Sequence, residues 1–489
     1  MANLALVVPF AGYLLLLLGV GVYFYMTKNR ETKRLTDYLL AGREAGTWTT
    51  AFSQVASGAS GYTFFGWVGI GYALGVQAFM YAFFAVIMQL VTWRFIAPKF
   101  RRQSGEYDSV TMVDHLARYF HDKNRQGADV IRVLGTLIVV GFLGIYLAAQ
   151  MQAIGQTGEV IFEIDYVTTI LVGGVVVAIY TTLGGYNASI WTDYLQGWLM
   201  VAAAIGFPLA AIQYAGGFEA FLTGVAEAGG AGLVTWNGGL EISGLFLGWA
   251  GLLGISLGFI GQPHVMQRFQ AIESEKLLSR GSVIATVLCA IRQGMPIFIG
   301  LSGYVILDSV GNPENIMIEG LPALFPSVIA GIIMAGIMSA ILSTTDSMVL
   351  LTASEVTRSI YERFINPDAS ERKLVYVGRI IVVVFMTLAV LVASLEISTI
   401  FALIVFGWTG LAAALGVPLV MELFWELTTA EGVIAGMIVG FVSTAVNNQM
   451  VMTEIYPLLA YPVTFLAVIV VSYLTRKRVV AEPEAVGSD

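Results

Sequence analysis

Hydroxyl and carboxylate side chains cluster at Ser339–Ser347, inside a segment that otherwise reads as a membrane-spanning helix. Hard cations prefer oxygen ligands, so such a cluster suits a small-cation site within a membrane. Alternatively, these hydroxyls bond to their own helix or to a neighbouring one, as is common in membrane bundles. On a helical wheel one broad face carries Ser339, Ala340, Ser343, Thr344, Asp346 and Ser347.

The second apolar span contains Gly58 and Gly61 among serines, near the middle of the membrane. Glycines weaken a helix locally. Unwound backbone is not tolerated against lipid, so it must face protein or a water-filled cavity. There the freed carbonyls coordinate a cation, and the half-helix dipoles face charged substrate groups. Close helix packing through small residues is the other interpretation.

Two charged residues lie inside other apolar spans. Asp193 lies near the cytoplasmic end of its helix, where it could bind a cation or proton. Alternatively, it is an acid at the N-terminus of a helix that Ser189 or Thr192 caps, where the helix dipole favours a negative charge. Arg292 lies near the midplane, where a charge is costly and needs a partner. That partner is either a substrate carboxylate or a protein carboxylate such as Asp346.

The composition predicts an all-α integral membrane protein. Of 489 residues, 57% are hydrophobic and 12% are charged, whereas soluble domains carry about 25% charged residues. Apolar runs near twenty residues recur along the chain, and we expect about 13 transmembrane helices. The expected spans are 5–26, 47–73, 76–97, 129–158, 164–184, 190–213, 243–264, 281–307, 325–350, 374–395, 398–423, 430–449 and 456–475.

Basic residues test this topology. Of the 25 lysines and arginines, all except Arg292 fall on one side of the thirteen-span arrangement. The positive-inside rule places that side in the cytoplasm. The N-terminus is therefore expected outside and the C-terminus in the cytoplasm.

The seventh span repeats the interruption of the second, with several glycines followed by Gln262-Pro263-His264. Interrupted helices at matching positions of two halves indicate an inverted-repeat transporter. We therefore divide the chain into 1–46 (first helix and loop), 47–213 and 243–423 (two five-helix repeats), and 424–489 (two final helices and a short tail).

These motifs resemble the sodium:solute symporter family, which shares the five-plus-five fold of the amino acid transporter LeuT. The resemblance covers nearly the whole chain, and the Gly-Gln-Pro-His stretch is most similar to the sodium/proline symporters. The matching pieces are Asp37–Arg43, Ala56–Gly61, Tyr146–Gln150, Gly184–Tyr186, Trp191–Asp193, Gly261–His264, Arg268-Phe269 and Ala340–Thr344.

The resemblance implies a sodium site between spans two and nine. Its ligands are the backbone carbonyls of Ala56, Ala59 and Ala340 and the hydroxyls of Ser343 and Thr344. Some relatives use a second sodium or release site, where an acid matching Asp193 meets hydroxyls such as that of Ser347. Because Asp346 stands where those relatives carry a hydroxyl, we expect one sodium per cycle.

The implied substrate site lies between spans two, four and seven. Two departures weaken a proline assignment: Gly58 replaces an acid of the proline symporters, and Ile255 and Phe259 replace a Trp and a Tyr. A small amino acid of the proline type remains the expected substrate. Because of the positive charge of Arg292, a more acidic substrate such as a carboxylate is an alternative. The expected contacts are Ser57, Ser60, Gly61, Tyr146, Phe259 and Gln262.

The predicted function is sodium-coupled symport of a small solute across the plasma membrane. Alternatives are a proton-coupled or uncoupled transporter, or a non-transporting sensor, of the same fold. An enzyme is not expected, because no nucleophile–base set or metal-ligand cluster is apparent and the three histidines are scattered. The sequence leaves the oligomeric state open, a monomer included.

Overall fold

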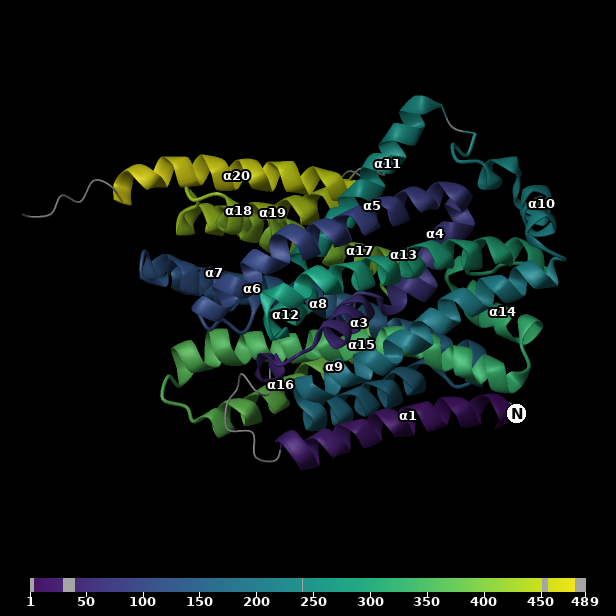
Figure 1. Cartoon of the computed structure of the whole chain (residues 1–489), viewed down its shortest axis with the longest axis horizontal. Coiled ribbons are helices and arrows are strands. Elements are labelled where there is room, and N and C mark those ends of the chain that lie inside the picture. The colour runs from purple at the N-terminus through teal and green to yellow at the C-terminus, as the bar shows by residue number, and fades with distance from the viewer. Residues whose placement is uncertain (1–3, 30–39, 240, 451–455, 480–489) are drawn as a thin grey trace, which may run out of the picture.

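The protein is an elongated bundle of helices that run roughly along its long axis (Figure 1). The computed structural model describes residues 4–29, 40–239, 241–450 and 456–479. Within these residues there is no β-strand, only an isolated bridge between Ala45 and Ile272. In the part of the chain that the structure describes, ten helices are long and apolar enough to cross a membrane, and two shorter apolar helices accompany them. The chain is a multi-pass membrane protein.

Each of the thirteen expected spans corresponds to helices in the described part of the chain. The first half contains α1 (Leu4–Phe24), α3 (Thr47–Ser57), α4 (Trp67–Leu74), α5 (Phe79–Val91), α6 (Ala97–Glu106), α7 (Met112–His121), α8 (Arg125–Phe162), α9 (Tyr166–Tyr214) and α10 (Phe218–Gly229). The second half contains α11 (Ile242–Leu257), α12 (Pro263–Ala271), α13 (Glu275–Ile306), α14 (Ile316–Leu324), α15 (Ser327–Glu355), α16 (Glu371–Ala393), α17 (Ile400–Leu411), α18 (Val417–Phe424), α19 (Ala430–Met450) and α20 (Tyr456–Val479).

The expected interruption of the second span is confirmed. Helix α3 ends at Ser57, and a wider helical turn resumes at Tyr62. The residue in left-handed conformation is Ser60, with φ of +56°, rather than either glycine. Its side chain supports the strained position, since Ser60 Oγ accepts hydrogen bonds from Tyr62 N (3.1 Å) and from Tyr146 Oη (3.0 Å).

The seventh span is also interrupted where expected. Helix α11 ends at Leu257, a 3₁₀ turn covers Gly258–Gly261, and Gln262 is extended before Pro263 opens α12. Close packing accounts for the glycines: a Cβ on Gly261 would lie 2.0 Å from the Cα of Ala412. The break therefore depends on contact with the segment that follows α17.

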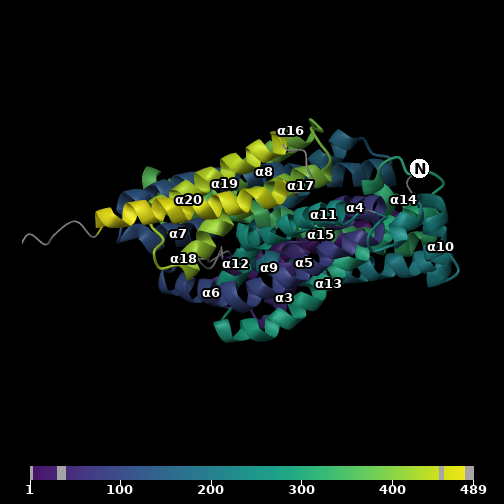
Figure 2. The same ribbon diagram turned by 90° about the horizontal axis from the view of Figure 1, so that it is seen from above.

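Helix α15 lies at the centre of the bundle and is buried from Met334 to Glu355. It packs against α9, α8, α1 and α3. Helices α16 and α20 run along the outside (Figure 2) and expose large apolar side chains such as Val383 and Leu466. An apolar exterior around a core that contains polar groups is the arrangement that a bilayer favours.

Candidate functional site

The hydroxyls of α15 meet the broken end of α3. Ser343 Oγ lies 2.9 Å from the carbonyl oxygen of Ala56, and Thr344 Oγ1 lies 2.9 Å from that of Ser57. All four residues are buried. The structure therefore brings together Ala56, Ser343 and Thr344 of the expected cation site and adds the Ser57 carbonyl.

These hydroxyls can donate a hydrogen bond to a carbonyl in the absence of a cation and can coordinate a cation when one is bound. A hydroxyl rotates about its C–O bond and presents either its proton or its lone pairs. Here the protons point to carbonyls at a helix end, where those oxygens lack full intrahelical partners. Rotation would turn hydroxyl and carbonyl oxygens toward one cation.

The two remaining expected ligands are placed differently. The Ala59 carbonyl already accepts bonds from Thr63 N (3.2 Å) and Thr63 Oγ1 (2.5 Å). Ala340 is fully buried within α15, one turn before Thr344. Their part in a sodium site stays a prediction.

A second polar cluster surrounds Arg268 of α12. Its guanidinium pairs with Asp193 at 2.9 Å, and both side chains are fully buried. Arg268 Nε also donates to Ser53 Oγ at 3.1 Å, and Nη2 contacts Ser347 Oγ. Asp193 additionally accepts a bond from Ser57 Oγ at 3.3 Å. The guanidinium thus contacts both Asp193 and Ser347, two oxygen ligands of the expected second cation site.

Asp346 belongs to the same cluster. Its Oδ1 accepts bonds from Ser189 Oγ and Ser347 Oγ, each at 3.1 Å. Within the described residues, Asp346 Oδ2 and Asp193 Oδ1 have no hydrogen-bond partner. The Arg268 guanidinium thus pairs with Asp193, and Ser189 and Ser347 link Asp346 to the same cluster.

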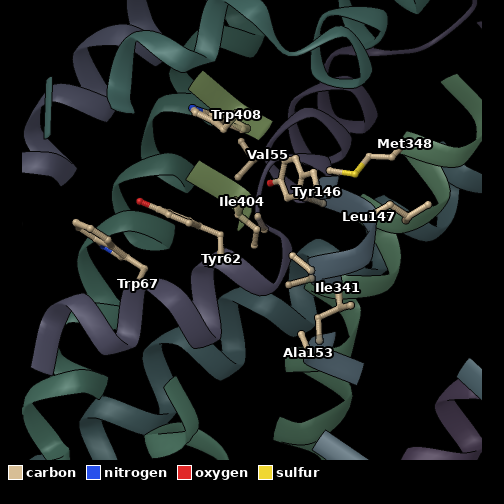
Figure 3. Packing of buried hydrophobic residues seen from close by; sticks show 14 of the residues in the cluster. Val55, Tyr62, Trp67, Tyr146, Leu147, Ala153, Ile341, Met348, Ile404 and Trp408 are labelled. Atoms are coloured by element: carbon tan, nitrogen blue, oxygen red, sulfur yellow. The ribbon is translucent and has the colours of Figure 1, made fainter. Parts of the chain in front are cut away.

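A small cavity of about 10 Å³ lies between the α3 break and α17. This volume is close to the minimum of about 10–15 Å³ that holds one water molecule, so the two segments are nearly closed on each other. Tyr62 and Tyr146 approach Ile404 from opposite sides, with Trp408 one turn further along α17 (Figure 3). The cavity wall includes Gly58, Tyr62, Tyr81, Tyr146, Arg292 and Trp408.

Among the expected substrate contacts, Tyr146 lines this cavity and donates its hydroxyl to Ser60. Gly61 lies behind it, with its N–H donated to Gln150 Oε1 at 2.8 Å. Ser57 belongs to the cation and Arg268 clusters instead. The expected contacts are therefore divided between three neighbouring sites.

The expected contacts of the seventh span pack beside the cavity. The Gln262 amide nitrogen donates to the carbonyls of Gly258 (2.9 Å) and Trp408 (2.8 Å). The Phe259 ring meets the Trp408 ring edge-on, with centroids 5.3 Å apart. The Gln262 side chain thus links the break of the seventh span to α17 by hydrogen bonds.

Arg292 forms no ion pair with Asp346. Its Nη1 donates to the Val55 carbonyl at 3.4 Å, and its guanidinium lies 5.4 Å from the centroid of the Phe259 ring. The ion pair between Arg292 and Asp346, one of the two alternatives from the sequence, is absent from the described residues. Asp346 bonds to Ser189 and Ser347 instead.

Several site residues had no individual role in the sequence analysis. Arg268 was counted among the cytoplasmic charges, but its side chain is fully buried. The feature that could have indicated its burial is its position in the same short helix as Pro263 and His264. Trp408 and Tyr62 carried no signal beyond aromatic character in apolar spans.

With the geometry established, comparison with known proteins defines the class. The sodium:solute symporter family matches residues 38–440, and the chain belongs to that family. It is a transporter and not an enzyme.

Curated relatives cover most of the chain. The sodium/proline symporter of Haemophilus influenzae is 32% identical over 95% of this chain and 93% of its own length. That of Escherichia coli is 31% identical over 86% and 84%. The high-affinity proline transporter of Bacillus subtilis is 30% identical over 94% and 96%.

Solved structures share the fold. A Na⁺-coupled sialic acid symporter in a substrate-bound outward-open state superposes with a TM-score of 0.78 at 21% identity, covering 96% of this chain and 97% of that one. MhsT in complex with L-phenylalanine gives 0.50 at 16% identity, covering 88% and 99%.

Proposed function

We propose that this protein imports a small carboxylate-bearing solute together with one sodium ion across the plasma membrane. The observation that carries the proposal is the meeting of the Ser343 and Thr344 hydroxyls with the Ala56 and Ser57 carbonyls. Family membership and the Na⁺-coupled structural relative support the choice of sodium.

Sodium binding orders the α3 break against α15, because one ion attracts oxygens from both helices. The small cavity beside the break then widens to hold the solute between Tyr62, Tyr146 and Trp408. Rocking of one helix group against the other opens the site to the cytoplasm. In this proposal Asp193, on α9, draws sodium inward once its pairing with Arg268 is disrupted.

The N-terminus is proposed outside and the C-terminus in the cytoplasm. Helix α1 begins at one end of the bundle, where α10 also lies. Helix α20 ends at the opposite end, where α7 lies (Figure 1). The basic residues Arg118 and Lys123 accompany α7, and the acidic Glu219 accompanies α10. This distribution agrees with the positive-inside rule.

A proline-type amino acid is one candidate substrate, since several relatives are named as proline transporters. A carboxylate without an amino group is the second candidate, which the unpaired Arg292 favours.

The sodium dependence of uptake by Ser343→Ala and Thr344→Ala in proteoliposomes tests the proposed ion site. A hydrogen bond or ligand to a charged group contributes about 1.5–3 kcal/mol. We therefore expect each substitution to raise the sodium concentration for half-maximal uptake roughly tenfold or more.

Thr345→Ala is the matched control. Thr345 is equally buried on the same helix, but its hydroxyl bonds only to the Ile341 carbonyl of its own helix. Its sodium dependence should match the wild type. An unchanged sodium dependence in both Ser343→Ala and Thr344→Ala would place the ion elsewhere.

A further inference from the structure

Arg292 is a buried cation that has no anionic partner among the described residues. It lies in the middle of α13 and is 7% exposed. Nη1 donates to the Val55 carbonyl at 3.4 Å, Nη2 lies 4.0 Å from Cys289 Sγ, and Nε has no hydrogen-bond partner. None of these contacts compensates its charge.

The other buried arginines among the described residues are compensated. Arg268 lies 2.9 Å from Asp193, and Arg132 lies 2.6 Å from Asp114. A buried charge without a counterion is strongly destabilising. Arg292 therefore differs from its counterparts within the same fold, and this difference points to a partner that arrives from outside the chain.

The guanidinium borders the cavity proposed for the solute. The other polar groups named on its wall are tyrosine hydroxyls and the Gln293 amide, and none of the lining residues is an aspartate or glutamate. A carboxylate would find a fork of donors at Arg292. An ammonium group would find no anion in this cavity.

Gly58 leaves one side of the guanidinium open. A Cβ at this position would lie 2.9 Å from Arg292 Nη1. The Gly58 backbone is right-handed, with φ of −92°, so the conformation does not demand glycine. What the glycine provides is space beside the charge.

We propose that the transported solute is a small carboxylate anion without an ammonium group, and that its carboxylate pairs with Arg292 beside Gly58. This deepens the sodium symport proposed above and rests on it. The apolar remainder of the solute packs on Tyr62, Tyr146 and Trp408. One sodium and one monovalent anion carry no net charge, so their joint transport is electroneutral.

Uptake in proteoliposomes tests the solute class. The probes are radiolabelled L-lactate, pyruvate, the ring-oxygen analogue of proline, and L-proline itself, each in sodium and in choline. We expect sodium-dependent uptake of at least one anion, at least tenfold more efficient than that of proline. An inside-negative potassium–valinomycin potential should leave this uptake unchanged. Sodium-dependent proline uptake that exceeds every anion and rises with the potential would overturn the inference while supporting sodium symport.

Substitutions at Arg292 separate a ligand role from a packing role. Arg292→Gln should lower anion uptake tenfold or more, and Arg292→Lys should restore part of it. Without substrate, Arg292→Gln should raise the Tm, because an uncompensated charge is removed. Unchanged anion uptake in Arg292→Gln, or a lowered Tm, would contradict the proposal.

Gly58 gives a test that does not depend on the solute. Gly58→Asp places a carboxylate against the guanidinium and should raise the Tm above that of Gly58→Asn, which has the same shape without the charge. Gly58→Asp should also abolish the rise in Tm that the anions give to the wild type. Equal Tm values for the two variants would show that Arg292 is already neutralised. Equal uptake of all solutes in sodium and choline, together with anion-dependent rises in Tm, would contradict the symport but not the Arg292 site.

Discussion

Arg268 is the buried cation that pairs with Asp193 beside the proposed sodium site. Its guanidinium reaches α3 through Ser53, α9 through Asp193 and α15 through Ser347. One side chain thus links three helices. In the proposed transport cycle, sodium release toward the cytoplasm would disrupt this ion pair.

Removing this guanidinium should destabilise the protein severely. Arg268→Leu leaves the buried Asp193 carboxylate without its cation, and loss of one partner of a buried pair costs about 3–5 kcal/mol. Thermal unfolding in detergent should show a Tm lowered by several degrees. Adding Asp193→Asn should recover part of the loss, because it removes the uncompensated charge.

Arg280→Leu serves as the control, since Arg280 is exposed near the start of α13. Its Tm should stay within about a degree of the wild type, as surface substitutions usually change stability by less than about 0.5 kcal/mol. Equal Tm values for Arg268→Leu and Arg280→Leu would show that the buried pair is not structural.

At this scale the sequence predicts residue types better than partners. Ser343 and Thr344 were predictable because oxygen-bearing side chains on one helical face of an apolar span are rare and costly. The partner of Arg268 was not, since helical periodicity does not tell whether a charge at the end of a span turns inward or outward. Likewise, the spacing of Arg292 and Asp346 carries no information on the distance between their helices.

The position of α17 depends on a residue in a distant loop. Glu314, in a short 3₁₀ turn at Pro313–Asn315, accepts hydrogen bonds from Phe401 N (2.9 Å) and Ile400 N (3.3 Å). These are free N–H groups of the first turn of α17, where a carboxylate is favoured. The contact fixes the first turn of the helix that carries Trp408 into the cavity.

Burial raises the pKa of Glu314 above 4.5, and this outweighs the two N–H bonds that lower it. The folded state therefore binds the proton more tightly than the unfolded state. The stability of the wild type relative to Glu314→Gln should rise as the pH falls through the raised pKa, and the gain should be complete below pH 4.5.

Tm measured from neutral to acidic pH checks this. At neutral pH we expect Glu314→Gln to match or exceed the wild type, because the amide oxygen keeps one acceptor without a buried charge. Glu314→Ala should lie below both, as it leaves the N–H groups of α17 unpaired. A pH-independent difference between wild type and Glu314→Gln would contradict this account.

At the level of elements, the sequence predicted both interruptions, because clustered glycines weaken an apolar helix at the depth where they occur. It did not predict that Ser60 takes the left-handed conformation. That outcome depends on the Tyr146 hydroxyl, which lies 86 residues away in the chain and bonds Ser60 Oγ. Gln262 likewise faces Trp408 only because α17 packs on the seventh span.

For the whole molecule, the charge on the solute sets how far sodium can drive it. One sodium entering a compartment held at about 100 mV inside-negative gains about 2.3 kcal/mol, and a tenfold sodium gradient adds about 1.4 kcal/mol. A zwitterion would accumulate about 500-fold, whereas a monovalent anion would accumulate only about tenfold, because its own charge cancels the electrical part. The Arg292 site thus affects both selectivity and energetics.

Sodium coupling itself is most directly tested by uphill uptake. Proteoliposomes loaded with the solute at its external concentration are diluted into sodium or into choline. Our account predicts transient accumulation above the external concentration in sodium, none in choline, and loss of the accumulation when an ionophore equilibrates sodium. Equal solute content in sodium and choline at all times would contradict it.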